Sequence, residues 1–238
     1  MAERLVVRES LEELSFLAAD WIREVAEAAV RLRGVFALGL SGGFTPVRTY
    51  QLLADPKAGP PLPWAATQVY WCDERCVPPD HPESNYGLAF KHLLSRVAIP
   101  LANVHRIRGE DAEPARAATQ YDRLLPPRLD LLVLGIGEDG HTASLFPGSP
   151  ALHDHVHRAA AVVAPKPPPR RITITPLVIE AAERLLVLAA GEGKAAAVAR
   201  ALSGPEDLDA CPAQLARRGF WLLDRAAAAN LEEGMHGR

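Results

Sequence analysis

Four short clusters of glycine and charged or hydroxyl residues could carry chemistry, because each follows directly on an apolar run. They are Ser41-Gly42-Gly43, Asp73-Glu74-Arg75, residues 137–141 (Gly-Glu-Asp-Gly-His) and residues 191–194 (Gly-Glu-Gly-Lys). If the apolar runs are parallel strands, their carboxyl ends meet at one edge of a sheet, where such folds bind ligands. The sequence therefore predicts one crevice lined by all four clusters.

The residue types in these clusters suit a phosphate group. Ser41-Gly42-Gly43 precedes an expected helix start near Pro46, so its backbone N–H groups would lie at a helix N-terminus, which favours anions. Arg75 and Lys194 could add a guanidinium and an ammonium. The nucleoside-triphosphate motif Gly-x-x-x-x-Gly-Lys-Ser/Thr is absent. We therefore expect a small phosphorylated metabolite as the ligand.

His141 is the predicted catalytic residue, because an imidazole exchanges protons at neutral pH and Asp139 is near enough in sequence to orient it. Residues 135–140 also match the dinucleotide motif Gly-x-Gly-x-x-Gly. That motif needs a long helix and a carboxylate at the end of the next strand. Pro147 would interrupt the helix, and the strand expected at 159–164 ends without a carboxylate. The sequence therefore disfavours a dinucleotide.

Two further groups of metal-binding residue types have simpler interpretations. His153, His155 and His157 would share one face of an extended segment and could hold a metal, but the segment lacks a strand pattern and we expect a solvated loop. Cys72 and Cys76 flank the second cluster, and we expect both to be buried, inert thiols. No metal site is predicted.

The elements that must position these clusters alternate along the whole chain. Strands are expected at 34–40, 68–72, 129–135, 159–164, 184–190 and 219–223. Helices are expected at 10–32, with Ser10 as N-cap and Glu13 completing a capping box, and at 85–96, 114–124, 176–183, 194–202 and 224–231. Apolar strands separated by helices predict an α/β fold with a three-layer, doubly wound, mostly parallel sheet in one domain, residues 1–238.

Composition sets wider limits on the function. The 238 residues carry a formal net charge of −3, which offers no electrostatic reason to expect nucleic acid or an anionic membrane as partner. The odd cysteine count suits a reducing compartment, and the first ten residues lack the apolar core of a signal peptide. No stretch approaches the roughly 18 uninterrupted apolar residues of a membrane span. We expect a cytoplasmic protein that is a monomer or a weak homodimer, with residues 225–230 in a terminal helix packed on the sheet.

The motifs resemble those of the 6-phosphogluconolactonase family. The resemblance rests on Ser-Gly-Gly-Phe-Thr-Pro at 41–46, Asp-Glu-Arg at 73–75, Ser-Asn-Tyr at 84–86, the run from Gly135 to Gly148, Arg-Ile-Thr-Ile-Thr at 171–175 and Gly193-Lys194. The matching segments keep their order over most of the chain. Phe44 departs from the family pattern, which more often has serine there, so a hydroxyl contact to the phosphate is in doubt.

This resemblance implies hydrolysis of 6-phosphoglucono-1,5-lactone to 6-phosphogluconate, the second step of the oxidative pentose phosphate pathway. The implied partner is a small phosphorylated sugar lactone, and no metal or organic cofactor is implied. A lactone is an activated ester, so a general base that deprotonates water is sufficient. By resemblance His141 is that base, returning the proton to the leaving ring oxygen, and Asp139 orients it.

The resemblance also assigns the binding residues. Arg75 and Lys194 would hold the phosphate together with the Ser41 loop and the N–H groups of Gly42 and Gly43. Arg171 is a weaker phosphate candidate. Asp73 is expected to bind sugar hydroxyls or to order Arg75, and backbone N–H groups of the turn that begins at Gly137 could stabilise the oxyanion.

Two other functions are compatible with parts of the same motifs, namely a deaminase and a non-catalytic sensor. The related glucosamine-6-phosphate deaminases share the Asp-Gly-His motif but continue with Ile-Ala-Phe-Asn-Glu-Pro, whose glutamate assists ring opening. This chain has Thr-Ala-Ser-Leu-Phe-Pro at 142–147 and lacks that glutamate, which favours the lactonase. A non-catalytic sugar-phosphate sensor would keep the binding residues without turnover.

Overall fold

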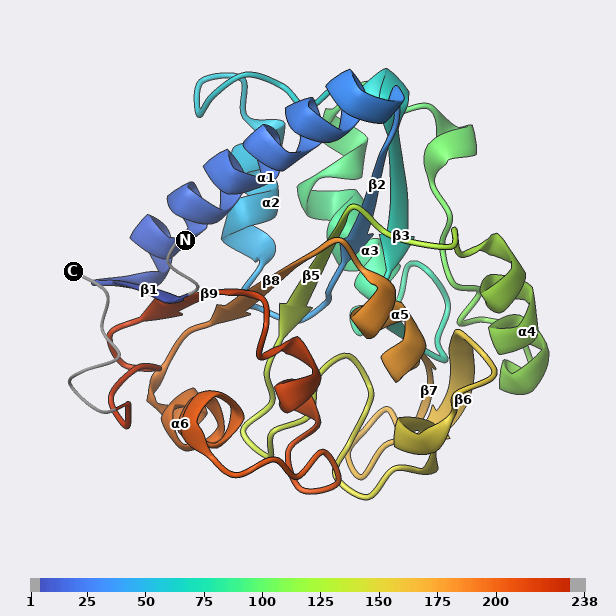
Figure 1. Cartoon of the computed structure of the whole chain (residues 1–238). Helices are drawn as coiled ribbons and strands as arrows, with labels where there is room; N and C mark the ends of the chain where they lie inside the picture. The colour runs from blue at the N-terminus through green and yellow to red at the C-terminus, as the bar shows by residue number, and fades with distance from the viewer. Residues whose placement is uncertain (1–4, 232–238) are drawn as a thin grey trace.

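A computed structural model describes residues 5–231. The predicted domain also includes residues 1–4 and 232–238, which lie outside the described residues. Six strands form one sheet in the order β1-β9-β8-β5-β2-β3, and every neighbouring pair is parallel (Figure 1). These strands are β1 (Leu5–Arg8), β2 (Phe36–Leu40), β3 (Thr67–Trp71), β5 (Leu131–Gly135), β8 (Arg184–Ala189) and β9 (Phe220–Asp224). The predicted mostly parallel α/β fold is confirmed.

Helices cover both faces of this sheet. On one side α1 (Leu11–Arg33) contacts α2 (Val47–Ala54), which contacts α3 (Asn85–His92) (Figure 1). On the other side lie α5 (Pro176–Ala181) and α6 (Ala195–Ser203). Short 3₁₀ helices span Trp64–Ala66, Leu94–Arg96, Leu101–Asn103, Pro150–His153, Glu192–Lys194 and Pro212–Ala216. None of the helices within residues 5–231 has the length and apolar character needed to cross a membrane.

The long first helix forms because its apolar residues recur with helical spacing and its start is capped. The side chain of Ser10 accepts a hydrogen bond from the backbone of Glu13 at 3.3 Å, as predicted. The Glu13 carboxylate accepts from the backbone of Glu9, one residue before the expected partner. Gly34 ends the helix in the left-handed conformation and donates to Val30.

A second sheet is the main departure from the predicted fold. Strands β4 (Asp73–Arg75), β7 (Arg170–Ile174) and β6 (Ala159–Val163) form an antiparallel sheet in the order β4-β7-β6, and α4 (Pro114–Leu124) packs on it. The prediction that 159–164 joins the parallel sheet is therefore wrong. The loop from β6 to β7 is too short for the crossover that a parallel pair requires, so the two strands pair antiparallel.

The predicted terminal helix over 224–231 is also wrong, because Asp224 ends β9 and residues 225–230 form turns. The carboxylate of Asp224 accepts hydrogen bonds from the backbone of Ala227 and of Gly191. An aspartate that bonds the backbone in this way offers it an alternative to the helical pattern. The same contacts join the end of β9 to the loop that follows β8.

Candidate active site

The carboxyl ends of β8, β5, β2 and β3 are neighbours in the sheet, so the four clusters that follow them meet at one edge. There they surround a cavity of about 400 Å³. The predicted residues that line it are Ser41, Gly42, Gly43, Asp73, Arg75, Gly137, His141, Arg171 and Lys194. Phe44, Asn85 and Lys166 line it as well. The cavity size suits a monosaccharide phosphate.

His141 and Asp139 form a hydrogen-bonded pair at the end of β5. One carboxylate oxygen of Asp139 contacts the imidazole Nδ1 and also accepts from the backbone N–H of His141 at 3.1 Å. Since a carboxylate only accepts, Nδ1 carries the proton and Nε2 is left with a free electron pair. A Cβ atom at Gly137 would overlap both side chains, so only glycine allows this packing. The pair has the arrangement of a general base and the group that orients it.

The electrostatics of the pair favour an ionised Asp139. Burial by itself would raise the pKa of Asp139, but the hydrogen bond and charge of His141, with a further contribution from Lys166, lower it overall. The imidazole is stacked on the ring of Phe146, with ring centroids 4.4 Å apart. Phe146 is buried, so it limits the movement of the imidazole from beneath.

The Ser41–Gly43 loop connects β2 to α2 and has the features of an anion site. The N–H groups of Gly42 and Gly43 donate to no other described residue. Gly43 has a φ of 84°, a conformation that glycine adopts at little cost. Tyr50 of α2 donates to the carbonyl of Ser41 at 2.7 Å and so holds the loop against the helix. Phe44 is 80% exposed at the rim, and its ring fills no part of the protein core.

Arg75 approaches the cavity from β4. Its Nη1 donates to the backbone carbonyl of Glu83 at 2.7 Å and to the Glu83 carboxylate at 3.3 Å, whereas its buried Nε has no partner in the described part of the chain. In the register of the second sheet, Arg75 lies directly opposite Arg171. Two like charges in directly opposed positions are unfavourable unless an anion lies between or beside them.

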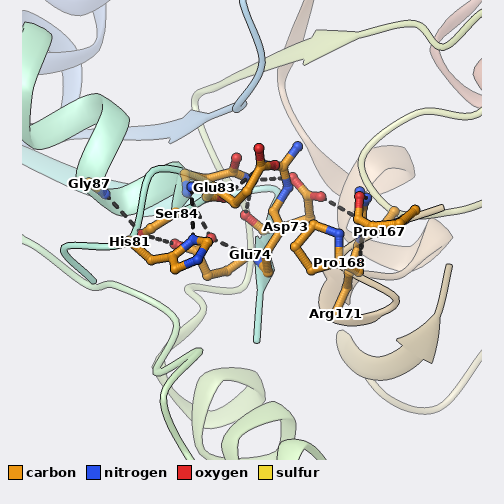
Figure 2. Close-up of polar contacts among 12 residues, drawn as sticks. Asp73, Glu74, His81, Glu83, Ser84, Gly87, Pro167, Pro168 and Arg171 are labelled. Carbon is orange, nitrogen blue, oxygen red and sulfur yellow. Dashed lines mark hydrogen bonds and ion pairs between the residues drawn. The ribbon is translucent and has the colours of Figure 1, made fainter. Parts of the chain in front are cut away.

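Glu74 fixes the segment that carries these residues. Its buried carboxylate accepts from the backbone N–H groups of Arg75, Asn85 and Tyr86 and from the hydroxyl of Ser84 (Figure 2). Ser84 is also the N-cap of α3 and accepts from the backbone of Gly87. Glu74 therefore joins β4 to the start of α3. Burial raises the pKa of Glu74, although these N–H donors oppose the effect.

Asp73 is held on both of its carboxylate oxygens. The amide of Asn85 donates to one oxygen at 2.9 Å, and the hydroxyl of Ser144 donates to the other at 2.5 Å. The Asn85 amide also donates to the backbone carbonyl of Asp73, so the orientation of this amide is set by two acceptors. Asp73 thus links β4, α3 and the segment that follows His141, and no contact of Asp73 with the Arg75 side chain is present.

Arg171 shapes the neighbouring loop as well as lining the cavity. It is 3% exposed, and it donates through Nε to the carbonyl of Pro168 at 3.0 Å and through Nη2 to that of Pro167 at 3.4 Å (Figure 2). Its Nη1 reaches the hydroxyl of Ser144 at 3.5 Å. Burial lowers the pKa of Arg171, and the charge of Arg75 lowers it further. The loop that Arg171 holds also carries Lys166.

The two alternative motifs that the sequence contains, residues 135–140 and the histidines at 153–157, form other structures. No helix follows residues 135–140, which lead instead into a turn and an isolated bridge between Thr142 and Leu145. His153 contacts Asp209, and His157 contacts Asp154 in an exposed segment. Within residues 5–231 no group of three or more His, Cys, Asp or Glu side chains is placed to hold a metal ion.

Several residues in or beside the cavity carry no recognisable motif of their own. Lys166 lies in a proline-rich run that looks like a plain loop, and Asn85 was visible only through the resemblance. Ser144 and Phe146 lie within the motif that follows His141, but nothing local shows that they contact Asp73 and the imidazole. A lysine between prolines, in a chain already predicted to bind a phosphate, is the one signal that could have indicated Lys166.

The chain is similar to known proteins in both sequence and structure. Residues 9–222 match the family described as Glucosamine-6-phosphate isomerases/6-phosphogluconolactonase. The 6-phosphogluconolactonase of Rattus norvegicus is 42% identical, over 92% of this chain and 90% of the rat protein. That of Homo sapiens is 40% identical, with the same coverage. The solved 6-phosphogluconolactonase of Trypanosoma brucei is 30% identical with a TM-score of 0.84, covering 96% of this chain and 98% of the other.

Proposed function

The chain belongs to the family of glucosamine-6-phosphate isomerases and 6-phosphogluconolactonases, and we propose that it hydrolyses 6-phosphoglucono-1,5-lactone to 6-phosphogluconate. This reaction is the second step of the oxidative pentose phosphate pathway. The proposal is carried by one observation: a hydrogen-bonded His141–Asp139 pair lies in the same cavity as the Ser41–Gly43 loop. A base and an anion site in one small cavity suit an ester that carries a phosphate.

The proposed chemistry begins with a water molecule held between His141 and the lactone carbonyl. The free Nε2 of His141 accepts a proton from the water, whose oxygen bonds to C1 while the carbonyl electron pair moves to oxygen. The tetrahedral intermediate then re-forms the carbonyl and breaks the bond between C1 and the ring oxygen. The protonated imidazole returns its proton to that oxygen, so His141 ends in its starting state. Such a base contributes a factor of about 10² to 10⁴.

Asp139 keeps the imidazole in the tautomer that this step needs. Its carboxylate holds the proton of Nδ1, so Nε2 faces the water as an acceptor. When the imidazole becomes charged, the same carboxylate stabilises the cation. The stacked ring of Phe146 then leaves the imidazole little freedom to turn away from the substrate.

Phosphate binding places the reacting carbon next to His141. The N–H groups of Gly42 and Gly43 are proposed to donate hydrogen bonds to the phosphate. Arg75 and Lys194 supply positive charge, and Arg171 lies opposite Arg75 and adds to it. Binding of the phosphate at one end of the cavity fixes the position of the sugar ring. Part of the binding energy is thereby used to orient the lactone carbonyl toward His141. Asp73 accepts hydrogen bonds from Asn85 and Ser144, and its proposed role is to fix both side chains on the side of the cavity that the sugar hydroxyls occupy.

His141→Ala provides the test. The variant is expected to lose 10²-fold or more of the rate above spontaneous hydrolysis, while 6-phosphogluconate still binds in calorimetry. Ammonia release from glucosamine 6-phosphate, assayed with the wild-type protein, tests the deaminase alternative, and we expect none. A wild-type protein that binds 6-phosphogluconate without accelerating lactone hydrolysis would be a sensor, and the proposal would be wrong.

A further inference from the structure

The proposed reaction leaves one requirement unassigned, namely a donor for the negative charge that develops on the carbonyl oxygen of C1. The backbone of the turn after β5 was the expected source. Three of its N–H groups already have acceptors within the turn: Gly137 donates to the carbonyl of His141 at 2.8 Å, Gly140 donates to that of Gly137 at 3.0 Å, and His141 donates to Asp139. These three N–H groups are therefore not available to an oxyanion.

The cavity instead holds cationic side chains, and some of these already form hydrogen bonds with other protein groups. Arg75 is bonded to Glu83, and Arg171 is bonded to the carbonyls of the proline loop. The ammonium groups of Lys166 and Lys194 have no hydrogen bond or ion pair with any residue in the described part of the chain. These two lysines are therefore available to a ligand.

Lys166 is the one placed beside the catalytic pair. Its Nζ lies 5.4 Å from the centre of the Phe146 ring, the same ring on which His141 is stacked. Its charge also acts on Asp139, lowering the pKa of that carboxylate. Lys194 comes from a different direction, at the start of α6 after the glycine turn that follows β8.

The loop that carries Lys166 is held firmly enough to position a charge. Pro167 and Pro168 follow Lys166, and both of their carbonyls accept from the buried guanidinium of Arg171 (Figure 2). Burial lowers the pKa of Lys166, and Arg171 and Lys194 act in the same direction although Asp139 opposes them. An ammonium in this environment gains from meeting a new negative charge.

We infer that Lys166 is a catalytic residue whose Nζ donates a hydrogen bond to the lactone carbonyl oxygen and stabilises the oxyanion formed when water adds. Lys166 keeps its proton throughout, because the proton taken from water is carried by His141 alone. Its effect is greatest in the transition state, where the oxygen carries most charge. The inference rests on the proposed lactonase function.

The test compares Lys166→Met with Lys194→Met as the matched control. In Lys166→Met, kcat for the phosphorylated lactone is expected to fall about 10²- to 10³-fold, the usual loss for one oxyanion donor. KM, and the Kd of glucose 6-phosphate, which has the phosphate but no carboxylate, are expected to change less than about threefold. In Lys194→Met, KM and the Kd of glucose 6-phosphate should rise, whereas kcat should change little. Lys166→Arg should recover part of the lost kcat, which a purely structural role would not predict.

Two further readouts separate the possible failures. Glucono-1,5-lactone lacks the phosphate but keeps the carbonyl, so Lys166→Met should slow its hydrolysis by the same factor as that of the phosphorylated lactone. The Kd of 6-phosphogluconate, whose carboxylate replaces the carbonyl, should rise about tenfold in Lys166→Met, although the Kd of glucose 6-phosphate stays nearly unchanged in that variant. An unchanged kcat in Lys166→Met, or a weaker Kd for glucose 6-phosphate matching the loss in kcat/KM, overturns the inference. If the wild-type protein shows no hydrolysis above the spontaneous rate, the proposed function itself fails.

Discussion

Arg75 of β4 and Arg171 of β7 lie directly opposite each other across an antiparallel strand pair, and both line the cavity at the edge of the parallel sheet. Directly opposed like charges lower the stability of a sheet by up to about 1 kcal/mol. The charge of Arg75 accordingly lowers the pKa of Arg171, whose burial acts in the same direction. A bound dianion would remove this repulsion.

The first prediction follows from this pair. 6-Phosphogluconate at about 100 times its Kd should stabilise the folded protein by about 2.7 kcal/mol, which corresponds to a rise in Tm of roughly 5 to 10 °C for a chain of this size. Arg75→Met should lose most of that rise. Thermal unfolding with and without the ligand measures it, with sodium chloride at equal ionic strength as control. An equal rise in Arg75→Met would exclude Arg75 from the site.

Asp139→Asn should lower kcat while leaving the affinity for 6-phosphogluconate nearly unchanged. The amide can no longer hold the proton on Nδ1 as a carboxylate does, so we expect a loss of about 10- to 100-fold, part of what a positioned base supplies. Because the pKa of Asp139 is lowered in the fold, Asp139 stays ionised throughout the working range. Any acid limb in the wild-type pH–rate profile should therefore persist in the variant, and its disappearance would assign that limb to Asp139.

Gly137→Ala should displace the imidazole of His141, the proposed base, because the added methyl group would overlap His141 and Asp139. The expected result is a loss of kcat of at least 10²-fold with little change in the spectrum of the folded protein. Gly135→Ala is the comparison variant, since Gly135 lines the same cavity but a Cβ there meets no protein atom within 4 Å. Comparable losses in both variants would show that any bulk near the end of β5 is harmful, contrary to this interpretation.

Glu74→Gln tests the junction between β4 and α3. The amide offers one acceptor oxygen where the carboxylate offers two, so some of the four donors lose their partner and the free energy of unfolding should fall by about 1 to 3 kcal/mol. Urea unfolding at neutral pH measures this difference.

The same variant has an expected pH dependence. The pKa of Glu74 is raised in the fold, chiefly by burial, so folding favours its protonated form. The stability that this group contributes is complete below its ordinary pKa of 4.5 and is lost as pH rises through the higher folded value. The wild-type protein should therefore gain stability relative to Glu74→Gln as pH falls toward 4.5. A difference that is constant with pH would contradict the raised pKa.

Much of the parallel sheet was predictable because its signals are local. An apolar run such as Phe36–Leu40, followed by glycine and then a helical pattern, identifies a buried strand and the loop at its carboxyl end. The same local signals placed His141 and the Ser41–Gly43 loop at the carboxyl ends of strands, where the structure has them. The turns over 224–231 were missed because alanine-rich composition favours a helix, whereas the decisive contact of Asp224 is with Gly191, which is distant in sequence.

By itself the sequence determined the order of strands and helices and the four clusters at the strand ends, since hydrophobic periodicity and glycine placement act over a few residues. Only the tertiary structure decided which side chains meet in the cavity. The pairing of Arg75 with Arg171, the bonds from Asn85 and Ser144 to Asp73, and the place of Lys166 beside the His141 pair each join segments far apart in the chain. Such contacts leave no local trace, because they depend on how whole elements pack rather than on the neighbours of each residue.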